Sequence, residues 1–315
     1  MKKIIYLNQW KTDIVKEIFP EIQILNSNDQ KFDEHLLNAE AIMGLGIPVD
    51  EAFLKKAPKL KIVSLTSVGY DNCDVEAMTK RGVLLTNTPD ILTETTADLA
   101  FALLMATARR ITEGSEMIRR GDWKGSVTEE IFGTDIHGKR LGILGLGRIG
   151  EAIARRGHFG FGMKISYHSR HEKKDLNFKA DYRSLDELLK ESDFVVVTIP
   201  LSKETKGLLG SREFGLMKKE AIFINIARGP IVDEKALIEV LRDRKIRAAG
   251  LDVFDKEPLP MNSPLLELKN VVLTPHIGSA TDKTREDMVR LAGSNIQAYF
   301  RGETPKNLVN REALS

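Results

Sequence analysis

The chain has 315 residues, of which 42% are hydrophobic and 29% are charged, which is the composition of an ordinary globular protein. Its 47 Lys and Arg residues nearly balance 45 Asp and Glu residues, and the net charge of +2 gives no reason to expect nucleic-acid binding. A single cysteine, Cys73, excludes an intramolecular disulfide and a multi-cysteine metal site, so we expect no metal. The length suggests two domains.

Neither a signal peptide nor a membrane-spanning helix is expected. The first apolar run, residues 4–7, has four residues, which is too few for the core of a signal peptide. The longest largely apolar run, residues 99–108, has ten residues, whereas a membrane span needs about 20. We therefore expect a cytoplasmic protein with no membrane partner.

In the first third of the chain, short apolar runs alternate with amphipathic stretches of helical length. Strands are predicted at residues 4–7, 22–25, 41–45, 62–65 and 83–86. The segments 50–56 and 75–80, which lie between such runs, are predicted as helices. Strands that alternate with helices indicate a parallel sheet covered on both faces.

Residues 93–123 interrupt this alternation. Thr95 and Asp98 resemble a capping box, and residues 97–120 behind Thr95 predict one long helix that is apolar on most faces. Such a helix must be covered on several sides, which an interface between domains or between subunits would achieve. We expect a homodimer on this basis.

A second alternation of strands and helices follows. The strands are predicted at residues 141–144, 164–167, 194–199, 222–226, 248–253 and 271–274. The helices between them are predicted at residues 147–156, 185–190 and 234–242, and a last helix at 284–300. The α/β pattern therefore predicts two doubly wound parallel-sheet domains.

A glycine-rich loop joins the first of these later strands to its helix. It consists of Gly145, Leu146, Gly147, Arg148, Ile149 and Gly150. The first glycine permits a tight turn, the second lets the backbone approach a pyrophosphate, and the third allows close helix–strand packing. The placement predicts dinucleotide binding; the alternative is that the glycines only form a turn.

The residues after the next strand bear on the choice of cofactor. An NAD-binding chain would carry an acid there to accept the ribose 2′-hydroxyl. Here the strand leads into Ser169 and Arg170, and no carboxylate occurs before Glu172. Ser169 and Arg170 suit a 2′-phosphate, so we expect NADP(H) to be preferred, with NAD(H) possible. The alternative is a solvated basic turn with no selective role.

Three later strands end in residues of unusual chemistry. Arg228 follows the predicted strand 222–226, Glu257 follows 248–253, and His276 follows 271–274. In a redox enzyme for 2-oxo acids, an arginine binds the carboxylate, a histidine supplies the proton and a glutamate stabilises the imidazolium. Taken singly, each has an ordinary alternative: a turn arginine, a loop acid and a hydrogen-bonded core histidine. We expect the three to converge because parallel strands end at one edge of the sheet.

Several motifs together resemble the D-isomer-specific 2-hydroxyacid dehydrogenase family over essentially the whole chain. They are Ser67–Asn72, Asn87–Asp98, Gly145–Gly150, Asn225–Pro230, Gly250–Phe254 and Pro275–Thr281. The resemblance implies a Rossmann NAD(P)-binding domain, residues 99–288, inserted into a flavodoxin-like substrate domain. That substrate domain would consist of residues 1–98 and be completed by 289–315.

The resemblance also implies roles for individual residues. Arg228 corresponds to the carboxylate-binding arginine, His276 to the acid/base and Glu257 to the partner of the histidine. Val68 and Gly69 correspond to the loop whose backbone amides hold the substrate carboxylate. The positions that correspond to the lining of the nicotinamide half of the cofactor site are Thr96, Pro200, Ile226, Asp252 and Gly278.

Within the family, residues 167–170 and 275–281 are most similar to NADPH-dependent glyoxylate/hydroxypyruvate reductases and 2-ketogluconate reductases. This similarity implies reduction of a small 2-oxo acid, glyoxylate or hydroxypyruvate, to the D-2-hydroxy acid, with His276 as proton donor. The alternatives are a 2-ketogluconate reductase (gluconate 2-dehydrogenase) and a cofactor-sensing binding protein. Related reductases often carry a tryptophan in the loop before the nucleotide domain. The corresponding residues here, 129–133, read EEIFG and contain no tryptophan. The family resemblance again implies a homodimer.

Overall fold

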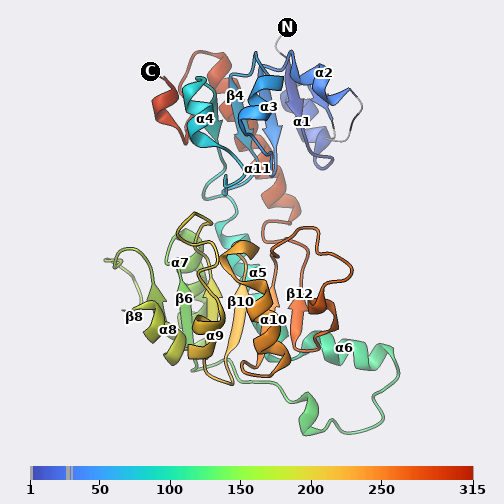
Figure 1. Cartoon of the computed structure of the whole chain (residues 1–315), viewed down its shortest axis with the longest axis vertical. Coiled ribbons are helices and arrows are strands. Elements are labelled where there is room, and N and C mark those ends of the chain that lie inside the picture. The colour runs from blue at the N-terminus through green and yellow to red at the C-terminus, as the bar shows by residue number, and fades with distance from the viewer. Residues whose placement is uncertain (1–2, 26–28, 30, 315) are drawn as a thin grey trace. The chain divides into compact units, whose positions relative to one another are not determined.

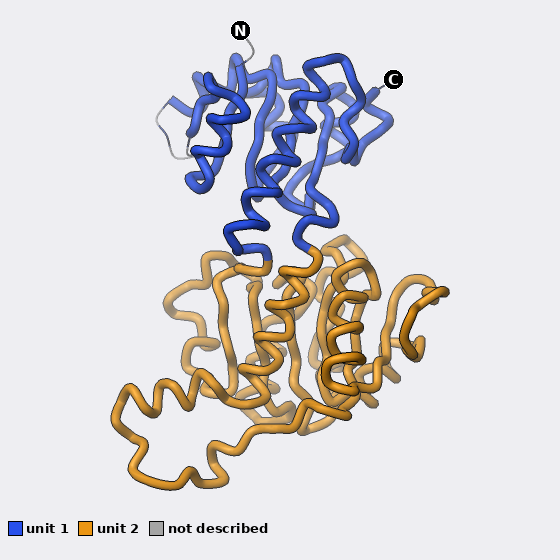
Figure 2. Tube along the Cα trace, turned by 180° about the vertical axis from the view of Figure 1, so that it is seen from behind, with its two compact units in different colours: residues 1–92, 279–315 blue, residues 93–278 orange. Residues whose placement is uncertain are grey.

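The computed structural model describes residues 3–25, 29 and 31–314, which form two compact units (Figure 2). Unit 1 contains residues 1–92 and 279–315, and unit 2 contains residues 93–278. The units thus divide after Leu92 and after Gly278, whereas the sequence placed the divisions after residues 98 and 288. The assignment of unit 1 as the substrate domain stays a prediction.

Unit 1 is built on a five-stranded parallel sheet with the strand order β2-β1-β3-β4-β5 (Figure 1). The strands are β1 (Ile4–Tyr6), β2 (Gln23–Ile24), β3 (Ala41–Gly44), β4 (Ile62–Leu65) and β5 (Leu84–Thr86). The helices are α1 (Thr12–Ile18), α2 (Phe32–Leu36), α3 (Glu51–Lys56), α4 (Val75–Lys80) and α11 (Asp282–Phe300), with a 3-10 turn η5 (Arg311–Leu314).

Alternate residues of these strands enter two separate cores. Ile5 and Val63 belong to the core that α2, α3 and α4 complete. Ile4 and Ile62, their neighbours in the chain, belong to the core that α1 and α11 complete. Burial on both faces explains why the strands read as continuous apolar runs, and the predicted parallel sheet is confirmed.

Unit 2 contains a seven-stranded parallel sheet with the order β12-β11-β10-β9-β6-β7-β8. Its strands are β6 (Arg140–Leu144), β7 (Lys164–His168), β8 (Ala180–Tyr182), β9 (Phe194–Val197), β10 (Ile222–Asn225), β11 (Ala248–Leu251) and β12 (Val271–Leu273). Its α-helices are α5 (Thr93–Ala108), α6 (Ile111–Arg119), α7 (Arg148–Arg155), α8 (Leu185–Glu191), α9 (Ser211–Leu216) and α10 (Glu234–Arg242). Short helical turns are η1 (Glu129–Ile131), η2 (Arg156–Gly160), η3 (Gly229–Ile231) and η4 (Pro264–Glu267).

This sheet too is buried on both faces. Helices α5 and α7 cover a core that includes Ile143 and Val196. Helices α8, α9 and α10 cover a second core that includes Val195 and Phe223. The predicted second parallel sheet is therefore confirmed, and the edge strand β8, which was not predicted, extends it beyond β7.

The single long helix predicted for residues 97–120 is wrong. Helix α5 ends at Ala108, and Arg110 adopts a left-handed conformation with φ 52° before α6 begins. Eight residues of α5 are buried, whereas α6 has none. The predicted capping box is wrong as well, because α5 begins at Thr93 and Thr95 lies inside its first turn. Asp98 instead pairs with Arg156 at 2.6 Å.

Among the described residues, no helix combines the length and the apolar character that spanning a membrane requires.

Candidate active site

The three chemically unusual residues follow three adjacent strands of unit 2. Arg228 comes after β10, Glu257 after β11 and His276 after β12, and these strands are neighbours in the order β12-β11-β10. The strands are parallel, so all three residues lie at the carboxyl edge of the sheet. Open α/β sheets bind their ligands at this edge.

Glu257 and His276 form a direct pair. His276 Nδ1 lies 2.7 Å from Glu257 Oε2, and the Phe254 N–H donates to Glu257 Oε1 at 3.0 Å. Burial alone would raise the pKa of Glu257, but the hydrogen bonds from His276 and Phe254 and the charges of His276 and Arg228 bring it below its usual value. Glu257 is therefore an ionised carboxylate that can orient and stabilise an imidazolium.

Arg228 is held beside this pair by its own loop. Asn225 accepts a hydrogen bond from Ala227 N at 3.1 Å and donates one to Arg228 O at 3.1 Å, while Arg228 Nη1 donates to Ala227 O at 2.7 Å. A side chain at Gly229 would place its Cβ 1.9 Å from the Phe254 carbonyl carbon. Only glycine permits this approach, which brings the Arg228 loop against the Glu257 loop.

Asp252 shapes the turn that carries His276. Its carboxylate is 1% exposed and accepts hydrogen bonds from Thr274 Oγ1 at 2.7 Å, Ile277 N at 2.8 Å and Gly278 N at 2.9 Å. Burial is the largest influence and raises the pKa of Asp252, against the opposing effect of these donors. His276 itself has φ 51°, so this hydrogen-bonded frame holds it in a left-handed backbone conformation.

The glycine-rich loop has the geometry that a bound pyrophosphate needs. Gly145 has φ 102°, and a Cβ on Gly150 would lie 2.1 Å from Gly145 O, so both positions require glycine. Gly147 is the N-cap of α7; no side chain caps the helix there, and a Cβ at Gly147 would meet open space. The N-terminal N–H groups of α7, at Arg148 and Ile149, are thus accessible to an anion, and the loop fits a dinucleotide.

The turn after β7 carries the two residues predicted to face a 2′-phosphate. Arg170 is exposed, and the Ser169 hydroxyl donates to His171 O at 3.0 Å. The end of β7 is joined to the glycine-rich loop, because Gly145 N donates to His168 O at 2.8 Å. Lys173 forms an ion pair with Glu151 of α7. The structure therefore brings Ser169 and Arg170 beside the loop that the sequence identified.

The remaining predicted residues occupy defined places, and their roles stay predictions. Thr96 is buried near Gly278, where a Cβ on the glycine would lie 3.5 Å from Thr96 Cγ2. Ile226 is buried at the end of β10, and Pro200 O accepts a hydrogen bond from Thr205 at 2.8 Å. Two further predicted residues belong to unit 1.

In unit 1, Val68 and Gly69 lie in the loop after β4. The Asn87 amide donates to Val68 O at 2.8 Å, and the Ser67 hydroxyl donates to Gly69 O at 2.8 Å. These two hydrogen bonds engage the carbonyl groups of the loop at the carboxyl edge of the sheet, the edge at which such sheets bind ligands.

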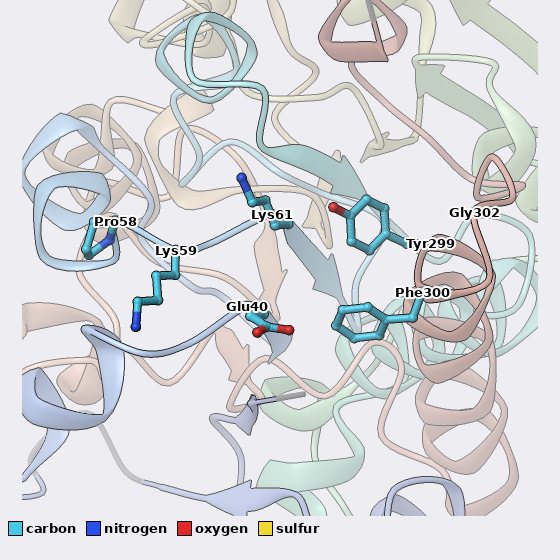
Figure 3. A pocket seen from close by; sticks show the side chains of 7 residues that line it. All are labelled: Glu40, Pro58, Lys59, Lys61, Tyr299, Phe300 and Gly302. Atoms are coloured by element: carbon cyan, nitrogen blue, oxygen red, sulfur yellow. The ribbon is translucent and has the colours of Figure 1, made fainter. Parts of the chain in front are cut away.

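A pocket of about 720 Å³ lies elsewhere in unit 1 (Figure 3). It is lined by Glu40, Pro58, Lys59, Lys61, Tyr299, Phe300 and Gly302. Glu40 directly precedes β3 and Lys61 directly precedes β4, so the pocket lies at the amino edge of the five-stranded sheet. Ligands bind such sheets at the opposite edge, and we assign no catalytic role to this pocket.

Sequence reasoning missed Tyr182, whose hydroxyl donates to Ser169 O at 3.0 Å. The strand that carries it, β8, has only three residues, and none of them is buried. Such a short segment carries no apolar periodicity, so its only signal was the aromatic residue itself.

A glycine-rich loop at the start of α7, together with an arginine, a glutamate and a histidine at the same sheet edge, defines a nucleotide-dependent oxidoreductase. Residues 101–278 match the family described as D-isomer specific 2-hydroxyacid dehydrogenase, NAD binding domain. The chain belongs to this family of oxidoreductases, as the sequence motifs predicted.

Proteins that are similar to this chain over nearly its full length include reductases of small 2-oxo acids by name. The chain is 48% identical over 319 residues to glyoxylate/hydroxypyruvate reductase B of Escherichia fergusonii, covering 98% of both chains. Among solved structures it is similar to an NADPH-dependent glyoxylate/hydroxypyruvate reductase of Sinorhizobium meliloti in complex with NADP and malonate, with 30% identity, a TM-score of 0.88 and 99% and 97% of the two chains covered.

A further solved relative binds the other nicotinamide cofactor. The D-lactate dehydrogenase of Aquifex aeolicus, in complex with NAD and lactic acid, is 29% identical to this chain, with a TM-score of 0.89 and 98% and 99% of the two chains covered. The shared fold therefore accommodates either cofactor. Which of the two a given chain prefers must be judged from its own residues in the turn after β7.

Proposed function

We propose that this protein reduces small 2-oxo acids to D-2-hydroxy acids with NADPH, and that glyoxylate and hydroxypyruvate are its leading substrates. The observation that carries this proposal is the 2.7 Å contact between His276 Nδ1 and Glu257 Oε2, at the sheet edge where Arg228 also lies. The names of the relatives, glyoxylate/hydroxypyruvate reductase B among them, support the choice of substrate.

Each of the three residues has one role in the proposed reaction. The Arg228 guanidinium binds the substrate carboxylate through two parallel hydrogen bonds. Glu257 holds His276 Nδ1, which leaves Nε2 to donate a proton to the carbonyl oxygen as that oxygen gains charge. NADPH, when bound, supplies the hydride that adds to C2. His276 is then neutral and regains its proton from water before the next turnover.

The neighbours of this trio complete the proposed site. We assign the backbone amides of Val68 and Gly69 to the substrate carboxylate, on the strength of the family motif 67–72. We assign the lining of the nicotinamide site to Thr96, Pro200, Ile226, Asp252 and Gly278 in the same way. The hydrogen bonds of Asp252 to the turn 274–278 support a role in shaping this lining.

NADPH preference rests on the turn after β7. Ser169 and Arg170 stand where an NAD-binding chain would place a carboxylate, and a carboxylate would repel a 2′-phosphate. The exposed guanidinium of Arg170 supplies the positive charge that such a phosphate needs. The loop Gly145–Gly150 is joined to the end of β7 just before this turn, because Gly145 N donates to His168 O at 2.8 Å.

We also propose a homodimer that covers an exposed apolar segment of unit 2. Helix α6 and the connection after it project from the body of unit 2 in Figure 1. The exposed apolar side chains of this segment are Ile111, Ile118, Trp123, Val127 and Phe132. Several exposed large apolar side chains in one projecting segment support the proposal that a second copy of the chain covers it. We further propose that the protein is cytoplasmic, as the sequence predicts.

Initial rates test the proposed function directly. Oxidation of NADPH and of NADH would be followed with glyoxylate, hydroxypyruvate, pyruvate and 2-ketogluconate. We expect turnover with the first two substrates and a higher kcat/KM with NADPH than with NADH. Turnover only with 2-ketogluconate would instead make the protein a sugar-acid reductase. Tight NADPH binding without turnover of any 2-oxo acid would favour the cofactor sensor.

A further inference from the structure

We propose that Tyr182 determines cofactor specificity by positioning the Ser169–Arg170 turn for the 2′-phosphate of NADPH. Tyr182 lies on the edge strand β8, which neither the family motifs nor the proposed catalytic residues include. This inference rests on the proposed preference for NADPH. The inference is based on the hydrogen bonds that hold the turn after β7 at both of its ends.

The first end of the turn is held by Tyr182 itself. The Tyr182 hydroxyl donates to Ser169 O at 3.0 Å, and the Ser169 hydroxyl donates onward to His171 O at 3.0 Å. Tyr182 pairs with Tyr167 in the β7–β8 register, and its ring stacks on the His168 ring at an interplanar angle of 11°. The ring therefore lies against Tyr167 and His168 of β7, and from there its hydroxyl reaches the turn.

The second end is held by Tyr167 and Lys173. The Tyr167 hydroxyl accepts a hydrogen bond from Lys173 N at 2.9 Å and donates to Lys173 O at 3.3 Å. The Lys173 ammonium pairs with Glu151 of α7, the helix that begins at the glycine-rich loop. The turn is therefore tied to β8 at one end and to α7 at the other, with the exposed Arg170 between them.

In this arrangement, one set of residues recognises the 2′-phosphate and another recognises the rest of the nucleotide. A 2′-phosphate would meet the side chains of Ser169 and Arg170, whose positions depend on the turn. The pyrophosphate would meet the N-terminus of α7, whose backbone is fixed by the glycines and by Gly145 N bonded to His168 O. Loss of the Tyr182 hydroxyl should therefore weaken the binding of nucleotides that carry a 2′-phosphate and spare those that lack one.

Tyr182→Phe removes only the hydroxyl and keeps the ring on His168. Calorimetric titration with 2′,5′-ADP and with 5′-AMP measures phosphate recognition without any catalysis. We expect about fivefold weaker binding of 2′,5′-ADP, the size of one ordinary hydrogen bond, with 5′-AMP changed by less than about twofold. Tyr299→Phe, a partly buried tyrosine in unit 1, is the matched control and should change neither affinity.

A thermodynamic cycle with the combined substitutions Ser169→Ala and Arg170→Gln tests whether Tyr182 acts through the turn. In the background of Ser169→Ala with Arg170→Gln, which lacks both side chains assigned to the 2′-phosphate, Tyr182→Phe should change 2′,5′-ADP binding by less than about twofold. A further fivefold loss there would overturn the inference, as would unchanged 2′,5′-ADP binding in Tyr182→Phe itself. Equal weakening of both ligands would also overturn it, because the tyrosine would then support the whole nucleotide site.

The same titrations separate this inference from the proposed function. If the wild type does not bind 2′,5′-ADP more tightly than 5′-AMP, the NADPH preference fails and the inference fails with it. If the wild type prefers 2′,5′-ADP and Tyr182→Phe leaves that preference intact, only the inference fails. Reduction of glyoxylate is measured independently of both results.

Discussion

Glu257 uses its two carboxylate oxygens for two different tasks. Oε2 lies 2.7 Å from His276 Nδ1, while Oε1 accepts a hydrogen bond from Phe254 N at 3.0 Å. The backbone bond fixes the carboxylate, and the fixed carboxylate then orients the imidazole ring. Because Nδ1 is occupied in this way, the other ring nitrogen, Nε2, is left for the substrate.

Glu257→Gln should reduce the rate of 2-oxo acid reduction. The amide carries no charge to stabilise the imidazolium that donates the proton. We expect kcat to fall by about 100-fold, measured as the initial rate of NADPH oxidation with saturating glyoxylate. A variant whose kcat equals that of the wild type would remove Glu257 from the proposed mechanism.

The lowered pKa of Glu257 also predicts how stability responds to acid. A carboxyl group whose pKa is lower in the folded state stabilises the fold above its unfolded pKa of about 4.3. That contribution is lost as the pH falls through the lower, folded pKa. The difference in unfolding free energy between wild type and Glu257→Gln should therefore shrink below about pH 4.3. Urea unfolding at pH 7 and at acid pH measures it; a constant difference contradicts the expectation.

Arg228→Ala should weaken substrate binding and leave the nucleotide site intact. The charged hydrogen bonds of a guanidinium to a carboxylate are worth about 1.5–3 kcal/mol, so we expect the KM for glyoxylate to rise by roughly 10- to 100-fold. Arg228→Lys keeps the charge and loses the planar fork, and it should recover only part of this loss. Titration with 5′-AMP provides the control, and an unchanged KM in Arg228→Ala would refute the assigned role.

Gly229→Ala should disturb the contact between the Arg228 and Glu257 loops. The added Cβ would lie 1.9 Å from the Phe254 carbonyl carbon, so one of the two loops must move. We expect a loss of about 2–3 kcal/mol in unfolding free energy and a large loss of activity. In the matched variant Gly215→Ala, the added Cβ meets open space on α9. This substitution should leave the unfolding free energy unchanged or raise it by up to about 1 kcal/mol. Similar behaviour of the two variants would show that the loops are free to separate.

Ile118→Glu should dissociate the proposed homodimer. The Ile118 side chain is 60% exposed on α6, and a buried unpaired carboxylate at an interface is costly. Sedimentation velocity at micromolar concentration should show a dimer for the wild type and a monomer for the variant. Leu37→Glu, at an apolar residue of unit 1 that is 52% exposed, should leave the dimer intact. A wild-type monomer under these conditions would rule out the homodimer.

The sequence alone determined both parallel sheets, the glycine-rich loop and the three residues of the proposed catalytic site. Strands buried on both faces appear as continuous apolar runs, and each of the three residues lies within six residues of the end of such a strand. Parallel strands bring their carboxyl ends to one edge, so following a strand was enough to place Arg228, Glu257 and His276 together.

Other features depended on contacts between segments that are distant in the chain. The apolar pattern after Thr93 continued past Ala108, but Arg110 turns the backbone and leaves α6 unburied. The strand β8 is too short to show a period, and only its pairing with β7 places Tyr182 against Ser169. Periodicity reports which residues are buried, whereas the choice of neighbour is decided by packing in three dimensions.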